Sequence, residues 1–189
     1  MALAARPIYQ IKVTLEWSKP PIWRRILLPK TTTLPRFHST LQASMGWTNC
    51  HLHQVLVGQI RYGIPDPEFD TNIVDERRVP LSRLLREKGD SLIYEYDFGD
   101  GWRHLVELEK ALPPDPSLTY PRCVAGERAC PPEDIGGVPG YEEFLEAIRD
   151  PAHPDHSHAS EWAEGRFDQD TFDLNEANSR LSKGRLRLV

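Results

Sequence analysis

The sequence predicts an α+β fold: one domain with a mostly antiparallel sheet, hairpins, several packing helices and a long proline-rich strap. Short segments alternate apolar and polar residues, which is typical of half-buried strands. Other segments carry one apolar face with helical spacing. The chain has 189 residues with 39% hydrophobic residues and three cysteines, which suits one domain with its own core. We place that domain at residues 6–182, followed by a basic tail at 183–189.

The N-terminal elements follow from alternation and from chain-breaking residues. Residues 11–17 alternate as a strand that ends at Pro20-Pro21, and residues 22–28 form a second strand. A helix begins after Thr33 and ends at Gly46, since its apolar residues fall on one face. Alternation returns over residues 52–62, a polar loop follows, and residues 80–88 form a short helix.

The clearest local prediction is a hairpin of residues 92–98 and 102–109. The three residues between these strands, Gly99-Asp100-Gly101, suit a type I turn with a bulge. This predicts Phe98 opposite Trp102, with Tyr96 opposite His104. Asp97 is then expected to face Arg103.

The C-terminal part is less regular. Residues 111–139 are proline-rich and are predicted to form a loop or strap across the core. A helix follows at residues 141–149, and the last helix spans residues 172–181. Residues 150–171 are acidic and carry three histidines, which we expect to be exposed.

Charge is distributed unevenly along the chain. Residues 1–65 hold eight of the 23 Lys and Arg residues but only one of the 28 Asp and Glu residues. This favours two solvated faces over a nucleic-acid surface, because the whole chain is acidic. The candidates for nucleic-acid contact are Arg24, Arg25, Lys30 and Arg36.

No apolar run approaches the length of a membrane span, and the N-terminal residues lack an apolar signal core. We therefore expect a cytoplasmic protein with no membrane partner.

Three segments hold the densest sets of chemically able residues. His51 and His53 would share one face of a strand. Asp97 and Asp100 flank a tight turn, and Glu133 and Asp134 follow two prolines. His53 and His104 lie on apolar faces and need partners, for which carboxylates are suitable. The candidate catalytic residues are His51, His53, His104, Asp97, Asp100, Glu133 and Asp134.

A divalent metal at these residues is one alternative, and a structural hydrogen-bond network is the other. The candidate metal ligands are His51, His53, His104, Asp97, Cys123 and Cys130. The two cysteines could also form a disulfide or be two buried apolar residues, which free cysteines often are. The sequence lacks the P-loop, dinucleotide and zinc-protease motifs, so no cofactor is predicted.

Several motifs resemble those of the plasmid pRiA4b ORF-3-like proteins. They include Pro20-Pro21-Ile22-Trp23-Arg24-Arg25, His51-Leu52-His53, Tyr94-x-Tyr96-Asp97-Phe98-Gly99-Asp100-x-Trp102-x-His104 and Pro131-Pro132-Glu133-Asp134-x-Gly136-Gly137. The resemblance implies a single α+β domain found in bacteria and archaea, often beside mobile genetic elements. Related sequences often have Cys after Pro-Pro-Glu-Asp where this chain has Ile135, which argues against a cysteine-based metal site.

The family that the chain resembles includes a transposon-borne branch whose members have been labelled resolvases. A recombinase needs a nucleophile supported by several arginines and a DNA-reading helix, and neither can be assembled here. We rank three functions. The first is a non-catalytic interaction or accessory module of mobile elements with a protein partner. The second is an enzyme with a His/carboxylate site, with a divalent metal as one form of it. The third is a DNA-binding protein.

Overall fold

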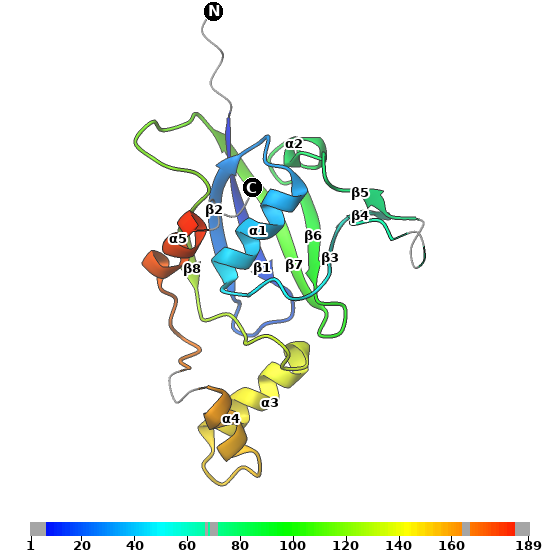
Figure 1. Ribbon diagram of the computed structural model, residues 1–189. Helices are drawn as coiled ribbons and strands as arrows, with labels where there is room; N and C mark the ends of the chain where they lie inside the picture. The colour runs from blue at the N-terminus through cyan, green and yellow to red at the C-terminus, as the bar shows by residue number, and fades with distance from the viewer. Residues whose placement is uncertain (1–6, 67, 69–71, 164–166, 184–189) are drawn as a thin grey trace, which may run out of the picture.

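The computed structural model describes residues 7–66, 68, 72–163 and 167–183, and it confirms the α+β class (Figure 1). One eight-stranded sheet has the order β5-β4-β3-β6-β7-β1-β2-β8. All pairs among these strands are antiparallel except β4–β5. The strands are β1 Ile8–Leu15, β2 Trp23–Pro29, β3 His53–Val57, β4 Ile60–Gly63, β5 Val74–Asp75, β6 Ser91–Tyr96, β7 Trp102–Leu112 and β8 Arg122–Glu127.

The helices are α1 Leu34–Met45, α2 Leu81–Leu84, α3 Gly137–Arg149, α4 His156–Trp162 and α5 Leu174–Lys183. Helix α1 lies across one face of the sheet beside α5, while α3 and α4 pack together at one end (Figure 1). Within the described residues, no helix combines the length and apolarity that a membrane crossing needs.

The core forms where α1 meets the sheet. Leu34, Phe37, Leu41 and Met45 recur at helical spacing and are buried, as the sequence predicts. Gly46 ends the helix with a φ of 102°, a left-handed conformation that glycine adopts without steric cost. Thr33 precedes the helix but makes no side-chain capping bond.

The predicted hairpin exists, but its predicted register is wrong. Tyr96 lies opposite Trp102, and Tyr94 lies opposite His104. The connection is therefore five residues long, from Asp97 to Gly101, and Phe98 is half exposed. A slip of two residues leaves every side chain on its own face, so alternation alone could not detect it.

The turn of the hairpin begins at Asp97, so that Phe98 lies within the turn and not at the end of the strand. The Gly101 N–H donates to the Asp97 carbonyl (2.6 Å), and the Gly99 N–H donates to Asp97 Oδ1 (3.0 Å). Arg103 does not face Asp97 as predicted, because the observed register places it opposite Glu95, and its guanidinium pairs with Glu16 at 3.1 Å.

The proline-rich strap also differs from the prediction. Part of it forms the edge strand β8, which pairs with β2. Helix α3 begins at Gly137, four residues before the predicted start, and α4 forms within the acidic segment that was predicted without a helix. The short helix α2 ends at Leu84 and not at residue 88. Glycine, alanine and charged residues interrupt the alternation of β8, and glycine and proline obscure the start of α3.

Candidate functional site

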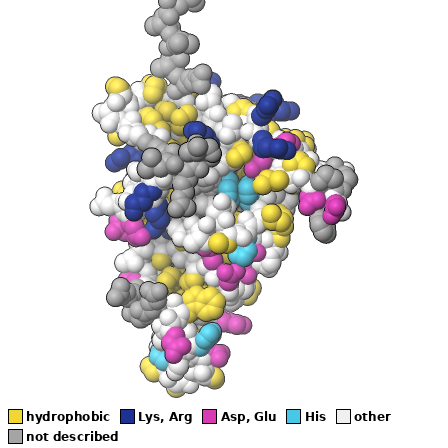
Figure 2. All heavy atoms as spheres, viewed as in Figure 1, with side chains coloured by type: hydrophobic (Ala, Val, Ile, Leu, Met, Phe, Trp, Pro, Cys, Tyr) yellow, Lys and Arg dark blue, Asp and Glu magenta, His cyan; other side chains and the backbone are white. Residues whose placement is uncertain are grey.

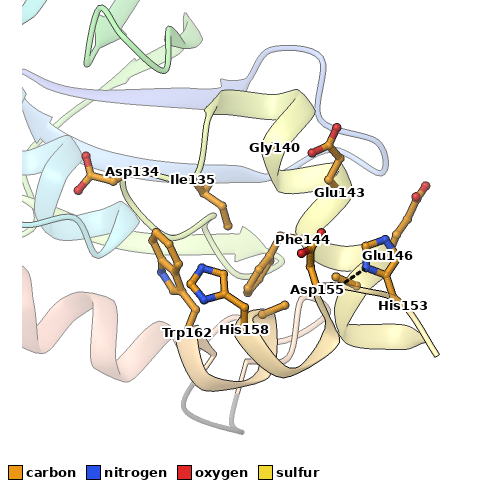
Figure 3. A pocket seen from close by; sticks show the side chains of 12 residues that line it. Asp134, Ile135, Gly140, Glu143, Phe144, Glu146, His153, Asp155, His158 and Trp162 are labelled. Carbon is orange, nitrogen blue, oxygen red and sulfur yellow. Dashed lines mark hydrogen bonds between the residues drawn. The ribbon is translucent and has the colours of Figure 1, made fainter. Parts of the chain in front are cut away.

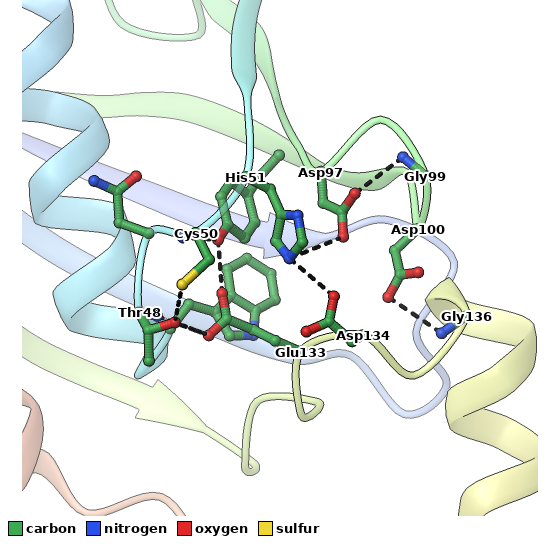
Figure 4. A network of polar contacts seen from close by, with 12 residues as sticks. Thr48, Cys50, His51, Asp97, Gly99, Asp100, Glu133, Asp134 and Gly136 are labelled. Atoms are coloured by element: carbon green, nitrogen blue, oxygen red, sulfur yellow. Dashed lines mark hydrogen bonds and ion pairs between the residues drawn. The ribbon is translucent and has the colours of Figure 1, made fainter.

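Three segments far apart in the sequence meet at one end of the sheet (Figure 4). His51 lies just before β3, Asp97 opens the β6–β7 turn, and Asp134 lies in the loop between β8 and α3. The sequence singled out all three segments, and the structure brings one acidic or histidine side chain from each to a common point.

The three side chains at this point could together hold a metal ion. His51 Nε2 lies 2.9 Å from Asp134 Oδ1 and 3.7 Å from Asp97 Oδ2. The three donor atoms all lie within 4.8 Å of one another. His51 Nε2 is buried and, within the described part of the chain, accepts or donates no well-directed hydrogen bond. The Asp97 side chain is 11% exposed, whereas that of Asp134 is 65% exposed, so the cluster opens toward solvent on one side.

Both carboxylates are held on left-handed backbone. Asp97 has a φ of 57° and Asp134 a φ of 59°, values that aspartate tolerates better than most residues. Because Asp97 Oδ1 accepts the Gly99 N–H, its Oδ2 is left to face His51. The local backbone therefore orients the Asp97 carboxylate toward His51.

Glu133 fastens the loop that carries Asp134. Its Oε2 accepts hydrogen bonds from the Thr48 N–H (2.8 Å) and the Thr48 hydroxyl (2.6 Å), and its Oε1 accepts the Tyr96 hydroxyl (2.6 Å). Burial and the bond to Glu133 raise the pKa of Tyr96, which keeps its hydroxyl protonated as a donor. The Trp47 indole N–H donates to the Pro131 carbonyl (2.9 Å), which anchors the same loop a second time.

Asp100 and two glycines allow the loop between β8 and α3 to lie close to the β6–β7 turn. Asp100 Oδ2 accepts the Gly136 N–H at 3.2 Å, so Asp100 binds the loop and is not one of the three clustered donors. A Cβ on Gly137 would stand 2.3 Å from the Asp100 carbonyl oxygen, and one on Gly140 would stand 1.9 Å from that of Ile135. Only glycine permits this approach.

His53 lies outside the cluster. Its Nε2 is 3.1 Å from Glu76, in a pair whose side chains are 7% and 2% exposed. Its ring stacks on His38, which also contacts the Tyr94 hydroxyl at 2.7 Å. Sequence reasoning missed His38 and Glu76. The spacing of Leu34, His38 and Gln42 places the last two beside the apolar face of α1 and could have indicated their burial.

His104 lies in the core without the carboxylate partner that the sequence led us to expect. It is fully buried, and neither ring nitrogen makes a well-directed hydrogen bond within the described residues, the nearest polar groups being the backbones of Tyr94 and Trp102. Its ring packs against Trp47 and Tyr94, with ring centroids 5.4 and 5.5 Å away. Burial lowers the pKa of His104 to about 4, so it is neutral at physiological pH.

The cysteines do not join the cluster of donors. Cys50, Cys123 and Cys130 are free thiols, and none belongs to the His51–Asp97–Asp134 group. Cys123 is buried, and burial raises the pKa of Cys130 to about 12. Metals bind the thiolate form of cysteine, so a protonated Cys130 is a poor ligand.

The candidate nucleic-acid residues are scattered. Arg24 is 2% exposed and donates to the carbonyls of Trp23, Ser44 and Glu127, while Arg25 pairs with Glu109 at 2.7 Å. Lys30 is half-buried, and Arg36 is exposed on α1. On the face in view, Lys and Arg side chains occur in separate groups (Figure 2).

Comparisons with known proteins show which family this chain belongs to. The family described as plasmid pRiA4b ORF-3-like protein matches residues 7–176. The chain belongs to this family. A member from Sinorhizobium fredii (strain NBRC 101917 / NGR234), the uncharacterized protein y4hQ, is 41% identical over 169 residues, which cover 89% of this chain and 86% of that protein.

The fold of this family is also seen in a crystal structure. Protein MM3350 from Methanosarcina mazei Go1, a protein of unknown function, superposes with a TM-score of 0.83 at 36% identity. The match covers 91% of this chain and 98% of that one. This structural match supports the fold, while the names of these relatives assign no activity.

Proposed function

We propose that the protein binds a divalent metal ion through His51, Asp97 and Asp134, and that the ion acts as a catalytic rather than a structural centre. The observation that carries the proposal is the buried Nε2 of His51, which faces carboxylate oxygens of Asp134 at 2.9 Å and Asp97 at 3.7 Å without a well-directed hydrogen bond to either. A buried ring nitrogen without a hydrogen bond costs free energy unless another partner takes its place.

The donor set suits such an ion. Ligand atoms about 2.1 Å from one metal lie roughly 3 to 4 Å apart, so the present spread of up to 4.8 Å closes with a small movement of the exposed Asp134. One imidazole and two carboxylates favour Zn²⁺ or Mn²⁺ over the purely oxygen-liganded Ca²⁺ and Mg²⁺.

Three protein ligands with one side open to solvent are characteristic of catalytic metal sites, in which water or substrate completes the coordination. An ion held there would acidify bound water or polarise a substrate oxygen. Glu133 would hold the Asp134 loop in place and is itself fully engaged with Thr48 and Tyr96.

Calorimetric titration of tag-free protein with Zn²⁺ and Mn²⁺ tests the proposal. We expect one ion per chain. The variant Asp134→Asn keeps the left-handed backbone that asparagine also tolerates and should lose at least tenfold in affinity without a change in melting temperature. Asp115→Asn is the control, because among the described residues the exposed Asp115 carboxylate accepts hydrogen bonds from Ser117 alone. Equal metal affinity in all three proteins would refute the site.

The biological setting is a second proposal, supported by the plasmid reading frame after which the family is described. The protein would serve mobile elements as an accessory factor in the cytoplasm, a reducing compartment that suits its three free thiols. Deleting the gene should change plasmid transfer or maintenance in a host that carries such an element, and complementation with Asp134→Asn should fail to restore it. Unchanged transfer and maintenance would reject this role.

A further inference from the structure

A cavity of about 520 Å³ lies between α3 and α4 and reaches the loop that carries Asp134 (Figure 3). Its volume is in the range of small-molecule sites. Ile135 and Phe144 form part of an apolar wall that faces Trp162. The cavity therefore lies next to the proposed metal centre, with Asp134 at the boundary between the two.

The charge around this cavity has one sign. Glu143 and Glu146 on α3 and Asp155 before α4 line it together with Asp134, and none of the described lining residues is a lysine or arginine. His153 accepts the Asp155 N–H through Nδ1 at 3.2 Å.

An aromatic surface is a separate feature of the same cavity. Trp162 is 44% exposed although it is the largest apolar side chain of α4. His158 packs edge-on against its ring, with the planes at 90° and the centroids 5.8 Å apart. An exposed indole face beside carboxylates attracts cations through the ring quadrupole as well as through charge.

We propose that this cavity binds an organic cation, namely an alkylammonium or guanidinium group on an apolar chain. The carboxylates would neutralise the charged group, and Ile135, Phe144 and Trp162 would cover the chain. This inference deepens the proposed function, because a ligand seated there lies beside Asp134 and the open side of the metal centre. The substrate class would then be a molecule with a cationic group near its reacting bond.

Hexylamine and hexan-1-ol are matched probes, since they share an apolar chain and differ in charge. The indole N–H resonance of Trp162, assigned with Trp162→Phe, reports binding at pH 8 in metal-free protein. We expect hexylamine to shift this resonance with at least tenfold higher affinity than hexan-1-ol. Similar affinities for the two probes, or no shift with hexylamine, would overturn the proposal.

The triple variant Glu143→Gln/Glu146→Gln/Asp155→Asn removes the charge and keeps the shape of three exposed side chains. It should weaken hexylamine binding at least tenfold, whereas Glu142→Gln, on the same helix but outside the lining, should not. Undiminished binding in the triple variant would also overturn the proposal.

Two further experiments are needed. One distinguishes a protein side chain from a free amine as the source of the cation, and the other separates the cation site from the metal site. A blocked Ala-Lys-Ala peptide that binds more tightly than hexylamine supports a lysine side chain of a protein, and the reverse order supports a free amine. His51→Ala, which lies outside the cavity lining, should retain hexylamine binding while losing the metal. If hexylamine binds but neither Zn²⁺ nor Mn²⁺ does, the metal function fails and the cation site stands.

Discussion

The imidazole rings of His38 and His53 stack face to face, with centroids 3.6 Å apart and planes 7° apart. His53 also pairs with the buried Glu76. Burial, followed by the nearby His53, lowers the pKa of His38 to about 4. Two stacked cations would repel each other in this site, so the packing requires at least one neutral ring.

The first prediction is a loss of stability in mild acid. His38 and His104 each have a folded-state pKa of about 4 against an ordinary value of 6.5. Between these values the unfolded chain binds more protons, so the free energy of unfolding falls as pH drops from 6.5 toward 4. The loss amounts to roughly 3 kcal/mol per histidine at most. Urea unfolding at pH 7.5, 6 and 5 measures it, and a flat profile would contradict the burial of these rings.

The second prediction isolates His104. Replacing His104 with Phe keeps a ring between Trp47 and Tyr94 and removes two buried polar atoms that make no well-directed hydrogen bond within the described residues. We expect the stability at pH 7.5 to rise by up to about 2 kcal/mol and the acid sensitivity to decrease. A loss of more than about 2 kcal/mol would show that the imidazole nitrogens have partners in solution.

Much of the fold could be predicted from the sequence, because alternation and helical spacing report which face of an element is buried. That information located α1, β1, β2 and both strands of the hairpin. It could not fix the hairpin register, because Phe98 and Tyr96 belong to the same alternating set. It also missed β8, where glycine, alanine and charged residues interrupt the pattern.

The sequence indicated which residues form the candidate site, but it could not indicate which side chains they contact. His51 and His53 would share a face on a strand, yet β3 begins only at His53. His51 therefore lies in the preceding loop and turns toward Asp97, while His53 turns toward Glu76. Nothing in the spacing of Glu76 connects it with a histidine 23 residues away, because that contact depends on the tertiary fold.

The third prediction compares two adjacent arginines on opposite faces of β2. Arg24 is buried, stacks 4.1 Å above the Phe172 ring and donates to three carbonyls. Arg24→Ala should cost about 3 kcal/mol, because it leaves a cavity and unpaired acceptors. Arg25→Ala removes a partly exposed pair with Glu109 and should cost less than about 1 kcal/mol. Equal losses in chemical denaturation would contradict this assignment.

The fourth prediction concerns DNA. Arg24 is buried and Arg25 is paired with Glu109, which leaves Lys30 and Arg36 as the more available of the four candidates. Non-specific DNA binding depends on several phosphate contacts that release counterions. We expect no retardation of duplex DNA in a gel-shift series at low salt. A retarded band that disappears with added salt would reinstate the DNA-binding alternative.

The last prediction separates the residue that positions the loop carrying Asp134 from the residues proposed to bind the ion. Glu133 accepts three hydrogen bonds from Thr48 and Tyr96 but is not one of the three clustered donors. Glu133→Gln keeps the size of the side chain and replaces one acceptor oxygen with a donor, which opposes either the Thr48 or the Tyr96 donor.

We therefore expect Glu133→Gln to lower stability by about 1 to 3 kcal/mol and to weaken Zn²⁺ binding by roughly tenfold, as the loss of an outer-shell partner does in metal sites. Asp134→Asn should leave the stability unchanged and should lose more Zn²⁺ affinity than Glu133→Gln does. Calorimetric titration and urea unfolding of the two variants side by side distinguish these roles. If Glu133→Gln abolishes metal binding while stability is unchanged, Glu133 is a ligand, and the assignment of the centre to His51, Asp97 and Asp134 is wrong.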